Sequence, residues 1–411
     1  MNVLLVDAVD FPFGGAHSVH VSLVMQGLVK NDANAFLIIP YGKKREAAVS
    51  NKKKYGHFDG IPYYFVKYSR KIKRIFRGFD IFWGVIKTAG LIYKRRKHKK
   101  LDAVILGGIV DIIRDSPVII TCAILRIPMY FWLVEKASLI QDDRGIAGFF
   151  NTQSQKLTEW LLPKFARGLI VISSNLKKHY LKYLPENRIL INPIVVSEDA
   201  HKSLNKTSVN DVKAKLEAVY AGKRVLVYSG SFGEKDGVFN LIEAFAEIIK
   251  TYPDTVFIMT GRSEEAKSMV KVNEYIKKFD LGDKIKLVGF VNADELLCYN
   301  TMADVLFVCR SNSAFAHHGF PWKLGEYCMT EKPIVATNVS DISTYFVNNE
   351  SLFIVEPNNP DQIAEKVNFI FSDYANAQAV AKKGKQAALK EFGYIEKTKD
   401  IVEFITRNNA K

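Results

Sequence analysis

Two adjacent histidines stand directly before a segment with helical spacing that carries a lysine and a glutamate. The stretch, residues 311–337, reads SNSAFAHHGFPWKLGEYCMTEKPIVAT, and its small polar residues predict a loop that holds the two histidines. Pro321 suits the first position of a helix, so we expect backbone N–H groups there to meet an anion at the positive end of the helix dipole. Lys323 and Glu326 share one helical face, where a carboxylate can accept ribose hydroxyls. The residues expected to line this site are His317, His318, Gly319, Phe320, Pro321, Lys323 and Glu326.

Two other interpretations of this stretch are open. Lys323 and Glu326 could form an ordinary surface ion pair, which contributes a few tenths of a kcal/mol. A metal site at His317 and His318 is disfavoured because adjacent histidines point in different directions and lack a Cys or Asp partner at suitable spacing.

A second candidate lies in YSGSFGEKDG, residues 228–237. Gly230 and Ser231 end a strand, and small residues there leave the backbone open to a ligand. Lys235 follows and can reach a diphosphate as a point charge. The alternative for Lys235 is a solvated loop residue.

Two further predicted strands end in segments that could contact a ligand. FIMTGRSEE places Arg262 after one strand, and KLVGFVNADEL places Phe290 and Val291 after another. Exposed backbone at such ends can pair with the edge of a nucleobase. Taken alone, neither is more specific than a turn.

Glycines also precede the first predicted helix. Gly14 and Gly15 allow backbone N–H groups to approach an anion at the helix start. His17, in the first turn, is a candidate proton donor or sugar contact. A tight turn and an ordinary helical histidine are the alternatives.

The elements that must position these residues alternate between strands and helices in both halves of the chain. Such alternation predicts an α/β fold of two Rossmann-like domains, each with a parallel sheet covered by helices. We expect an acceptor-side domain at 1–196, a polar linker at 197–211, and a donor-binding domain at 212–390. A final helix at about 391–411 is expected to pack back on the first domain. Ligands of such sheets bind beyond the carboxyl ends of the strands, so the two domains would face each other across a cleft.

The composition of the chain limits the classes of protein to which it can belong. The chain has 411 residues, of which 48% are hydrophobic and 25% charged, as in ordinary globular proteins. Its first residues lack the basic start of a signal peptide, and no uncharged apolar run is long enough to span a bilayer. The four cysteines are far apart, so we expect reduced core residues in a cytoplasmic protein.

The net charge of +15 is concentrated in one segment. Residues 67–100 carry 13 Lys and Arg against the single acid Asp80, which leaves +12. The aromatic and apolar run GFDIFWGVIKTAGLIY lies between the basic clusters. This pattern favours docking on an anionic membrane surface. A solvated basic face over core helices is the alternative, and nucleic acid is disfavoured because the segment contains no nucleic-acid-binding motif.

These motifs together resemble the family-4 retaining glycosyltransferases of the group 1 type, which have the GT-B fold. The similar run covers roughly 224–357 and includes VYSGSFGEKDGVFNLIEAF and HGFPWKLGEYCMTEKPIVAT. The Gly14–Gly15 loop and RGLIVISSNLKKHYLKYL resemble the first domain of that family more weakly. As a set the motifs are specific, although no single one is.

The resemblance implies roles for individual residues. Lys235 matches the lysine that neutralises the donor diphosphate, and Glu326 matches the second of two glutamates that contact the sugar and the ribose. The first glutamate is replaced by His318 here, and an arginine of the family by Ser231. Arg262 or Lys323 would then supply the missing cation. In the first domain, Glu135 is the candidate to face the donor sugar.

The implied activity is transfer of a hexose, with retention, from a nucleotide sugar to a glycan or lipid-linked acceptor in surface polysaccharide assembly. No Asp-x-Asp occurs in the sequence, so we expect neither a metal nor another cofactor. We expect the protein on the inner face of the membrane, held there peripherally. A nucleotide-sugar 2-epimerase of the same fold and a non-catalytic protein that binds sugar nucleotides are the alternatives.

Overall fold

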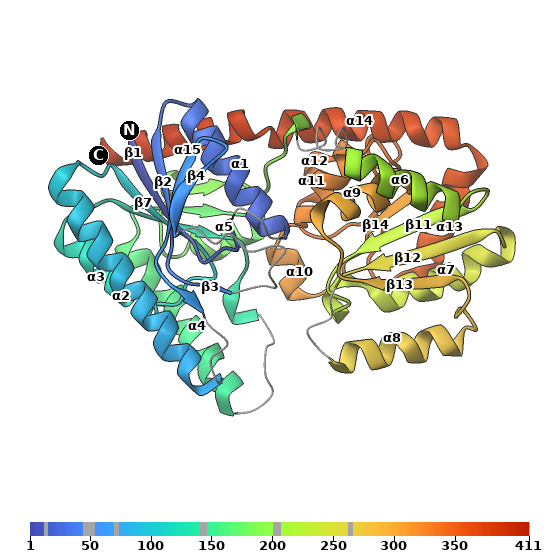
Figure 1. The fold of residues 1–411 in the computed structure, drawn as a ribbon, viewed down its shortest axis with the longest axis horizontal. Coiled ribbons are helices and arrows are strands. Elements are labelled where there is room, and N and C mark those ends of the chain that lie inside the picture. Colours follow the sequence, from blue (N-terminus) through green and yellow to red (C-terminus); the bar gives the residue numbers. More distant parts are fainter. Residues whose placement is uncertain are drawn as a thin grey trace. The chain divides into compact units, whose positions relative to one another are not determined.

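The structure is a computed structural model, and it describes residues 1–11, 15–43, 54–69, 74–139, 146–199, 207–261 and 266–410. The chain forms two compact units, which Figure 1 shows with their elements labelled. Unit 1 comprises Met1–Val195, His318–Phe320 and Gly393–Lys411. Unit 2 comprises Val196–His317 and Pro321–Phe392. No helix of the described residues combines the length and the apolarity needed to cross a bilayer.

Unit 1 is built on an eight-stranded sheet in the order β10-β9-β8-β7-β1-β2-β5-β4. All neighbours in it are parallel except β4 and β5. The hairpin between β4 and β5 turns through Asp59 and Gly60, whose φ values of 49° and 77° suit a two-residue turn. The strands are β1 (Asn2–Val6), β2 (Asn34–Ile39), β4 (Tyr55–Phe58), β5 (Ile61–Phe65), β7 (Ala103–Gly108), β8 (Met129–Leu133), β9 (Gly168–Val171) and β10 (Ile189–Ile191), with a separate pair of β3 (Gly42–Lys43) and β6 (Tyr68–Ser69).

The last helix of the chain packs on the first helix of unit 1. Lys30 Nζ donates a hydrogen bond to the Tyr394 hydroxyl, and Asn31 Nδ2 donates to the Ile395 carbonyl at 2.9 Å. Gly27 permits the close approach, because a Cβ there would lie 2.3 Å from Thr398 Oγ1. The helices of unit 1 are α1 (Ala16–Lys30), α2 (Arg74–His98), α3 (Ser116–Ile124), α4 (Ile146–Phe165), α5 (Ser174–Tyr180) and α15 (Tyr394–Asn409), with short turns η1 (Ala137–Leu139) and η2 (Glu186–Arg188).

Unit 2 is built on a six-stranded parallel sheet in the order β13-β12-β11-β14-β15-β16. Its strands are β11 (Arg224–Ser229), β12 (Thr255–Thr260), β13 (Ile285–Gly289), β14 (Val305–Val308), β15 (Ile334–Thr337) and β16 (Phe353–Val355). Its helices are α6 (Thr207–Val219), α7 (Val238–Thr251), α8 (Ala266–Lys278), α9 (Ala293–Met302), α10 (Ala314–His318), α11 (Trp322–Met329), α12 (Ile342–Tyr345), α13 (Pro360–Ser372) and α14 (Tyr374–Phe392), with the turn η4 (Glu234–Asp236).

Continuous apolar strands create the core of unit 2. Phe257 on β12 and Phe307 on β14 are buried and lie 5.6 Å apart between ring centres. Phe245 on α7 packs against Phe257 at 5.4 Å. Such runs are expected of parallel strands that are covered on both faces.

The prediction of an α/β fold with two Rossmann-like parallel sheets is confirmed. One part of the predicted linker 197–211 is wrong, because α6 begins at Thr207. Val209, Val212 and Leu216 lie three and four residues apart there, so the segment has an apolar face, and Val209 is buried.

Two local predictions in the histidine stretch are also wrong. Pro321 is the N-cap of α11, with extended backbone (φ −75°, ψ 108°), and is not the first helical residue. His317 and His318 end the short helix α10 instead of lying in a loop. The missed signal is Ser313, whose hydroxyl accepts the Ala316 N–H at 3.2 Å and so caps α10.

Candidate functional site

The strand order of unit 2 reverses between β11 and β14. From β11 the chain continues outward through β12 and β13, and from β14 it continues in the other direction. Ligands of open parallel sheets bind beyond the carboxyl ends of the strands at such a switch point. The residues that follow β11 and β14 are therefore the first place to look for a site.

Three cations gather at this switch point around Asp236. We call Lys235, Arg310 and Lys323 the cation cluster. Burial raises the pKa of the Asp236 carboxyl, but Lys323, the Ser231 hydroxyl, Lys235 and Arg310 outweigh burial and hold that pKa below its ordinary value. Ser231 donates to Asp236 Oδ2 through Oγ at 2.6 Å and through its N–H at 3.2 Å. The site therefore has an excess of positive charge around one fixed carboxylate.

The three cations differ in how firmly they are held. Lys323, on α11, donates from Nζ to the Ser229 carbonyl at 2.5 Å and lies 4.6 Å from the centre of the Tyr228 ring. Arg310 donates from Nη1 to the Ala316 carbonyl at 3.4 Å. Lys235 is exposed, with Nζ 4.7 Å from the centre of the Phe315 ring. Lys323 is thus the most constrained of the three and Lys235 the most accessible.

Two glycines allow the backbone to pack tightly beside the cluster. A Cβ on Gly230 would lie 2.0 Å from the Tyr228 hydroxyl and 3.0 Å from Lys323 Nζ. Gly261 has φ +130°, and a Cβ there would lie 1.9 Å from the Gly230 carbonyl oxygen. Larger residues at either position would displace the strand ends that form the site.

Glu326 lies one turn after Lys323 on α11, as expected from their spacing. Burial raises the pKa of Glu326 to about 7, and the nearby Lys323 only partly offsets that effect. Near neutral pH this carboxyl therefore exists in both protonation states and can either donate or accept a hydrogen bond to a hydroxyl.

The histidine stretch is divided between the two units. His317 belongs to unit 2, with Nε2 2.8 Å from Asn312 Oδ1 and Nδ1 3.4 Å from the Ser340 N–H. His318, Gly319 and Phe320 belong to unit 1.

His318 has specific partners in unit 1. Its carbonyl accepts a hydrogen bond from Ser173 Oγ at 2.8 Å. Its ring lies edge-on to the His179 ring, with 6.5 Å between ring centres. The imidazole of His318 thus packs on a second imidazole.

Unit 1 has its own switch point, between β1 and β7. Asp7 directly follows β1 and is only 4% exposed, and His17 on α1 places Nε2 3.1 Å from both of its carboxylate oxygens. Burial lowers the pKa of His17, but Asp7 and Glu135 outweigh burial and raise it. Gly15 is the N-cap of α1. This end of the unit 1 sheet therefore combines a buried carboxylate with a partly exposed imidazole.

Asp7, Asp236 and Arg310 are residues that the sequence interpretation missed. Asp7 and Arg310 follow apolar strands, in LLVD and FVCR, which is the one signal that could have identified them. Gly14 and Arg262, both predicted, lie outside the described residues. Phe290 and Val291 follow β13, where Phe290 is exposed.

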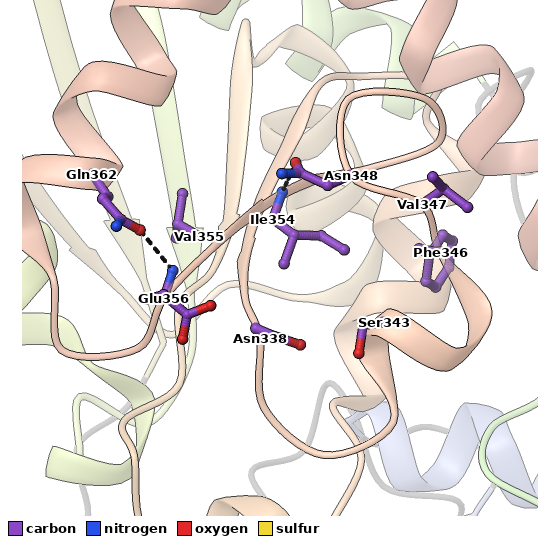
Figure 2. Close-up of a pocket in the computed structure, with 9 residues that line it drawn as sticks. All are labelled: Asn338, Ser343, Phe346, Val347, Asn348, Ile354, Val355, Glu356 and Gln362. Atoms are coloured by element: carbon purple, nitrogen blue, oxygen red, sulfur yellow. Dashed lines mark hydrogen bonds between the residues drawn. The ribbon is translucent and has the colours of Figure 1, made fainter.

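A separate hollow of about 490 Å³ lies in unit 2 beyond β15 and β16 (Figure 2). Asn338 and Glu356, which directly follow these strands, line it. Asn348 Oδ1 accepts the Ile354 N–H and Gln362 Oε1 accepts the Glu356 N–H, both at 2.9 Å. These amides complete backbone hydrogen bonds at the edge of the sheet, and no predicted site residue lies there.

Among the residues that the structure describes, no three His, Cys, Asp or Glu side chains are grouped so that they could hold a metal ion. All four cysteines are buried and free of disulfides.

The sequence of unit 2 matches a known family. Residues 210–387 match the family model described as glycosyl transferases group 1. Spore coat protein SA of Bacillus subtilis (strain 168) is 23% identical over 197 residues, which is 46% of this chain and 50% of that protein. The capsular polysaccharide biosynthesis glycosyltransferase CapM of Staphylococcus aureus is 24% identical over 229 residues, which is 55% of this chain and 58% of CapM. The chain thus spans about half the length of the curated relatives it matches.

The fold as a whole also has solved counterparts. The crystal structure of Anabaena HepE in complex with UDP-glucose superposes with a TM-score of 0.72 at 16% identity, covering 99% of this chain and 100% of that one. At this identity the likeness shows the fold alone. The resemblance to group 1 glycosyltransferases is confirmed by the family match, and the GT-B architecture of two Rossmann-like domains by the structural likeness.

Proposed function

We propose that this chain, whose residues 210–387 form a group 1 glycosyl transferase domain, transfers a hexose from a nucleotide-sugar donor to a hydroxyl of a glycan or lipid-linked acceptor. The observation that carries the proposal is the cation cluster at the switch point of unit 2. Its three positive charges lie around the carboxylate of Asp236, and Lys323 also lies near the half-protonated Glu326, so an excess of positive charge remains. A donor diphosphate supplies the negative charge that this arrangement lacks.

The same cluster serves catalysis. As the bond between sugar and phosphate breaks, negative charge grows on the leaving diphosphate. Cations that are already positioned stabilise this charge without reorganising, which is the largest contribution in many enzymes. Lys323 is held by Ser229 and the Tyr228 ring, so it is preorganised in this sense. A divalent metal is therefore not required by the mechanism we propose.

Glu326 and the first unit supply the remaining roles. The half-protonated Glu326 carboxyl bonds ribose hydroxyls of the donor. In unit 1, Asp7 orients the imidazole of His17 so that it can hydrogen-bond a hydroxyl of the acceptor. Glu135 adds to the local negative potential. We propose retention at the anomeric carbon, with the leaving diphosphate taking the proton of the acceptor hydroxyl.

We propose that the acceptor is reached at a membrane surface. Phe79, Phe82 and Trp83 follow one another at helical spacing on α2 and are 72%, 44% and 55% exposed. Exposed aromatic rings and a basic last turn on one helix favour the interface of an anionic bilayer. Three of the predicted basic residues, Arg70, Lys71 and Lys73, lie outside the described residues.

Replacing Arg95, Arg96 and Lys97 with glutamine is expected to weaken sedimentation with anionic vesicles while leaving donor binding unchanged. Equal sedimentation of the variant and the parent would refute the membrane role.

The donor is tested by thermal denaturation with a panel of nucleotide sugars, because a ligand that binds only the folded state raises Tm. UDP-sugars are the first members, since the similar solved structure of Anabaena HepE is a complex with UDP-glucose. Nucleoside monophosphates are the matched control that lacks the second phosphate. Stabilisation by monophosphates equal to that by nucleotide sugars would contradict a diphosphate site.

Turnover separates the alternatives. Release of nucleoside diphosphate that depends on an added acceptor supports transfer, and an NMR spectrum of the product gives the anomeric configuration. Isomerisation of the donor alone would identify an epimerase. Donor binding without turnover across a broad acceptor panel would identify a non-catalytic protein. Activity retained in EDTA tests independence from metal.

A further inference from the structure

We propose that unit 1 binds the phosphate and adjoining hydrocarbon chain of a lipid in a cavity between α2 and the outer part of its sheet. The cavity has a volume of about 400 Å³. Neither Asp7 nor His17 lines it, and the binding requires no transferase activity, so it goes beyond the function proposed above.

The floor of the cavity is apolar because of how two elements meet. Phe36 and Ile38 are two residues apart on β2 and face the same side of the sheet. Tyr64 on β5 is the register partner of Ile38. Leu91 on α2 closes the floor from the helix side. These four side chains offer a hydrocarbon surface that a fully charged ligand would leave unused.

The rim is cationic. Lys94, Arg95 and His98 lie three, four and seven residues after Leu91, so they share its helical face, and Lys99 follows directly. The Arg95 guanidinium carbon lies 4.3 Å from the centre of the Phe36 ring, which places a cation at the boundary of the floor. None of the residues described as lining the cavity is acidic. The rim therefore attracts an anion.

The C-terminal end of a helix carries about half a negative charge, which opposes an anion. Lys94, Arg95 and Lys99 more than offset this partial charge. Lys54 adds a further cation, with Nζ 5.4 Å from the centre of the Tyr64 ring.

An apolar floor joined to a cationic rim fits an amphiphile with an anionic head. Inorganic phosphate would contact the rim only, and a neutral hydrocarbon the floor only. A lipid phosphate satisfies both surfaces at once.

The test compares decyl phosphate, inorganic phosphate and decyl maltoside by isothermal titration calorimetry. Both decyl compounds are kept below their critical micelle concentrations. We expect decyl phosphate to bind at least ten-fold more tightly than either of the other two. Equal affinity for inorganic phosphate would reduce the site to an anion patch, and equal affinity for decyl maltoside would reduce it to an apolar groove. Either result would overturn the proposal.

Matched variants locate the site. In Lys94→Gln/Lys99→Gln two rim charges are lost, and we expect the affinity for decyl phosphate to fall about ten-fold, since one decade corresponds to about 1.4 kcal/mol. In Lys97→Gln/Lys100→Gln the same charge is lost from residues that do not line the cavity, and we expect no change. All four lysines are exposed, so both variants should fold, which thermal denaturation checks. Equal losses in the two variants would mean unspecific attraction and would reject the cavity as the site.

The same variants keep this proposal separate from the proposed transferase. Stabilisation by a nucleotide sugar should be unchanged in both, because the cation cluster lies in unit 2. A protein that binds decyl phosphate as expected but no nucleotide sugar would retain the lipid site and lose the transferase.

Discussion

The two units share a sheet architecture but present opposite chemistry at their switch points. Unit 2 gathers Lys235, Arg310 and Lys323 around one carboxylate. Unit 1 places the buried carboxylate of Asp7 against the imidazole of His17. The strand order reverses at the same position in both sheets, so topology alone does not decide what a site binds.

Under the proposed function, this difference assigns donor binding to unit 2 and acceptor binding to unit 1. A cationic site suits a donor diphosphate, whereas a carboxylate would repel it. A carboxylate and an imidazole suit a neutral hydroxyl, because they can accept its hydrogen bond and influence its proton. Four substitutions test this assignment, and each has an outcome that would contradict it.

The largest effect is expected from Lys323→Met. The substitution removes the ammonium that lies beside Ser229 and Asp236. Donor affinity should fall about 100-fold, because a charge-assisted hydrogen bond contributes about 1.5–3 kcal/mol. Titration calorimetry with the best nucleotide sugar measures the loss, and Lys250→Met, at an exposed pair with Glu247 on α7, is the control. A change smaller than three-fold would remove the cation cluster as the donor site.

Glu326→Gln should change how stability depends on pH. The pKa of Glu326 is about 7 when folded and 4.5 ordinarily, so between these values the folded state binds more protons than the unfolded state. The free energy of unfolding of the unmodified protein therefore falls as pH rises from 4.5 to 7. The glutamine variant does not show this fall, because its amide does not titrate. At pH 8 the variant should be more stable by about 3 kcal/mol, with little difference at pH 4.5.

Denaturant unfolding of both proteins at each pH gives that difference and cancels the other titrating groups. A stability difference that stayed constant from pH 4.5 to 8 would mean that Glu326 is not buried in an environment that disfavours its charge.

Asp7→Asn tests the unit 1 side of the comparison. The amide keeps the shape but loses the charge that raises the pKa of His17. Turnover should fall about ten-fold, below the 10²–10⁴ of full acid–base catalysis because the imidazole remains. Donor affinity should not change, and the NMR titration of His17 should move to lower pH. Weaker donor binding in this variant would break the separation of roles between the units.

Lys235→Ala is expected to have the smallest effect. Its ammonium is exposed, and exposed charges contribute up to about 1 kcal/mol, so donor affinity should fall about three-fold. The loss should disappear in high salt, where the loss caused by Lys323→Met persists. A loss as large as that of Lys323→Met would show that the accessible lysine, and not the constrained one, binds the diphosphate.

Regular apolar runs made most of the fold predictable. Strands such as β12 and β14 consist of buried residues throughout, and the helices between them have apolar faces. The start of α6 was missed because TSVND is polar until Val209 packs. The hairpin at Asp59 and Gly60 was missed although Asp-Gly between strands is a readable turn signal.

The site was predictable only in part. Lys323 and Glu326 could be paired from helical spacing, and Lys235 from its place after a strand. Arg310 and Lys323 approach Asp236 from elements that are far apart from it in sequence, and no local spacing reveals that proximity. The division of His317 and His318 between units also depends on long-range packing at Ser173 and Ser340.

The packing of α15 on α1 has a consequence for biosynthesis. Residues near 30 and 394 must meet before the first unit is complete, whereas the second is encoded almost wholly between them. A chain emerging from the ribosome therefore has all residues of its second unit before it has those that complete its first. Synthesis that stopped before Tyr394 would leave the surface around Gly27 exposed to solvent and to chaperones, while all residues of unit 2 were already present.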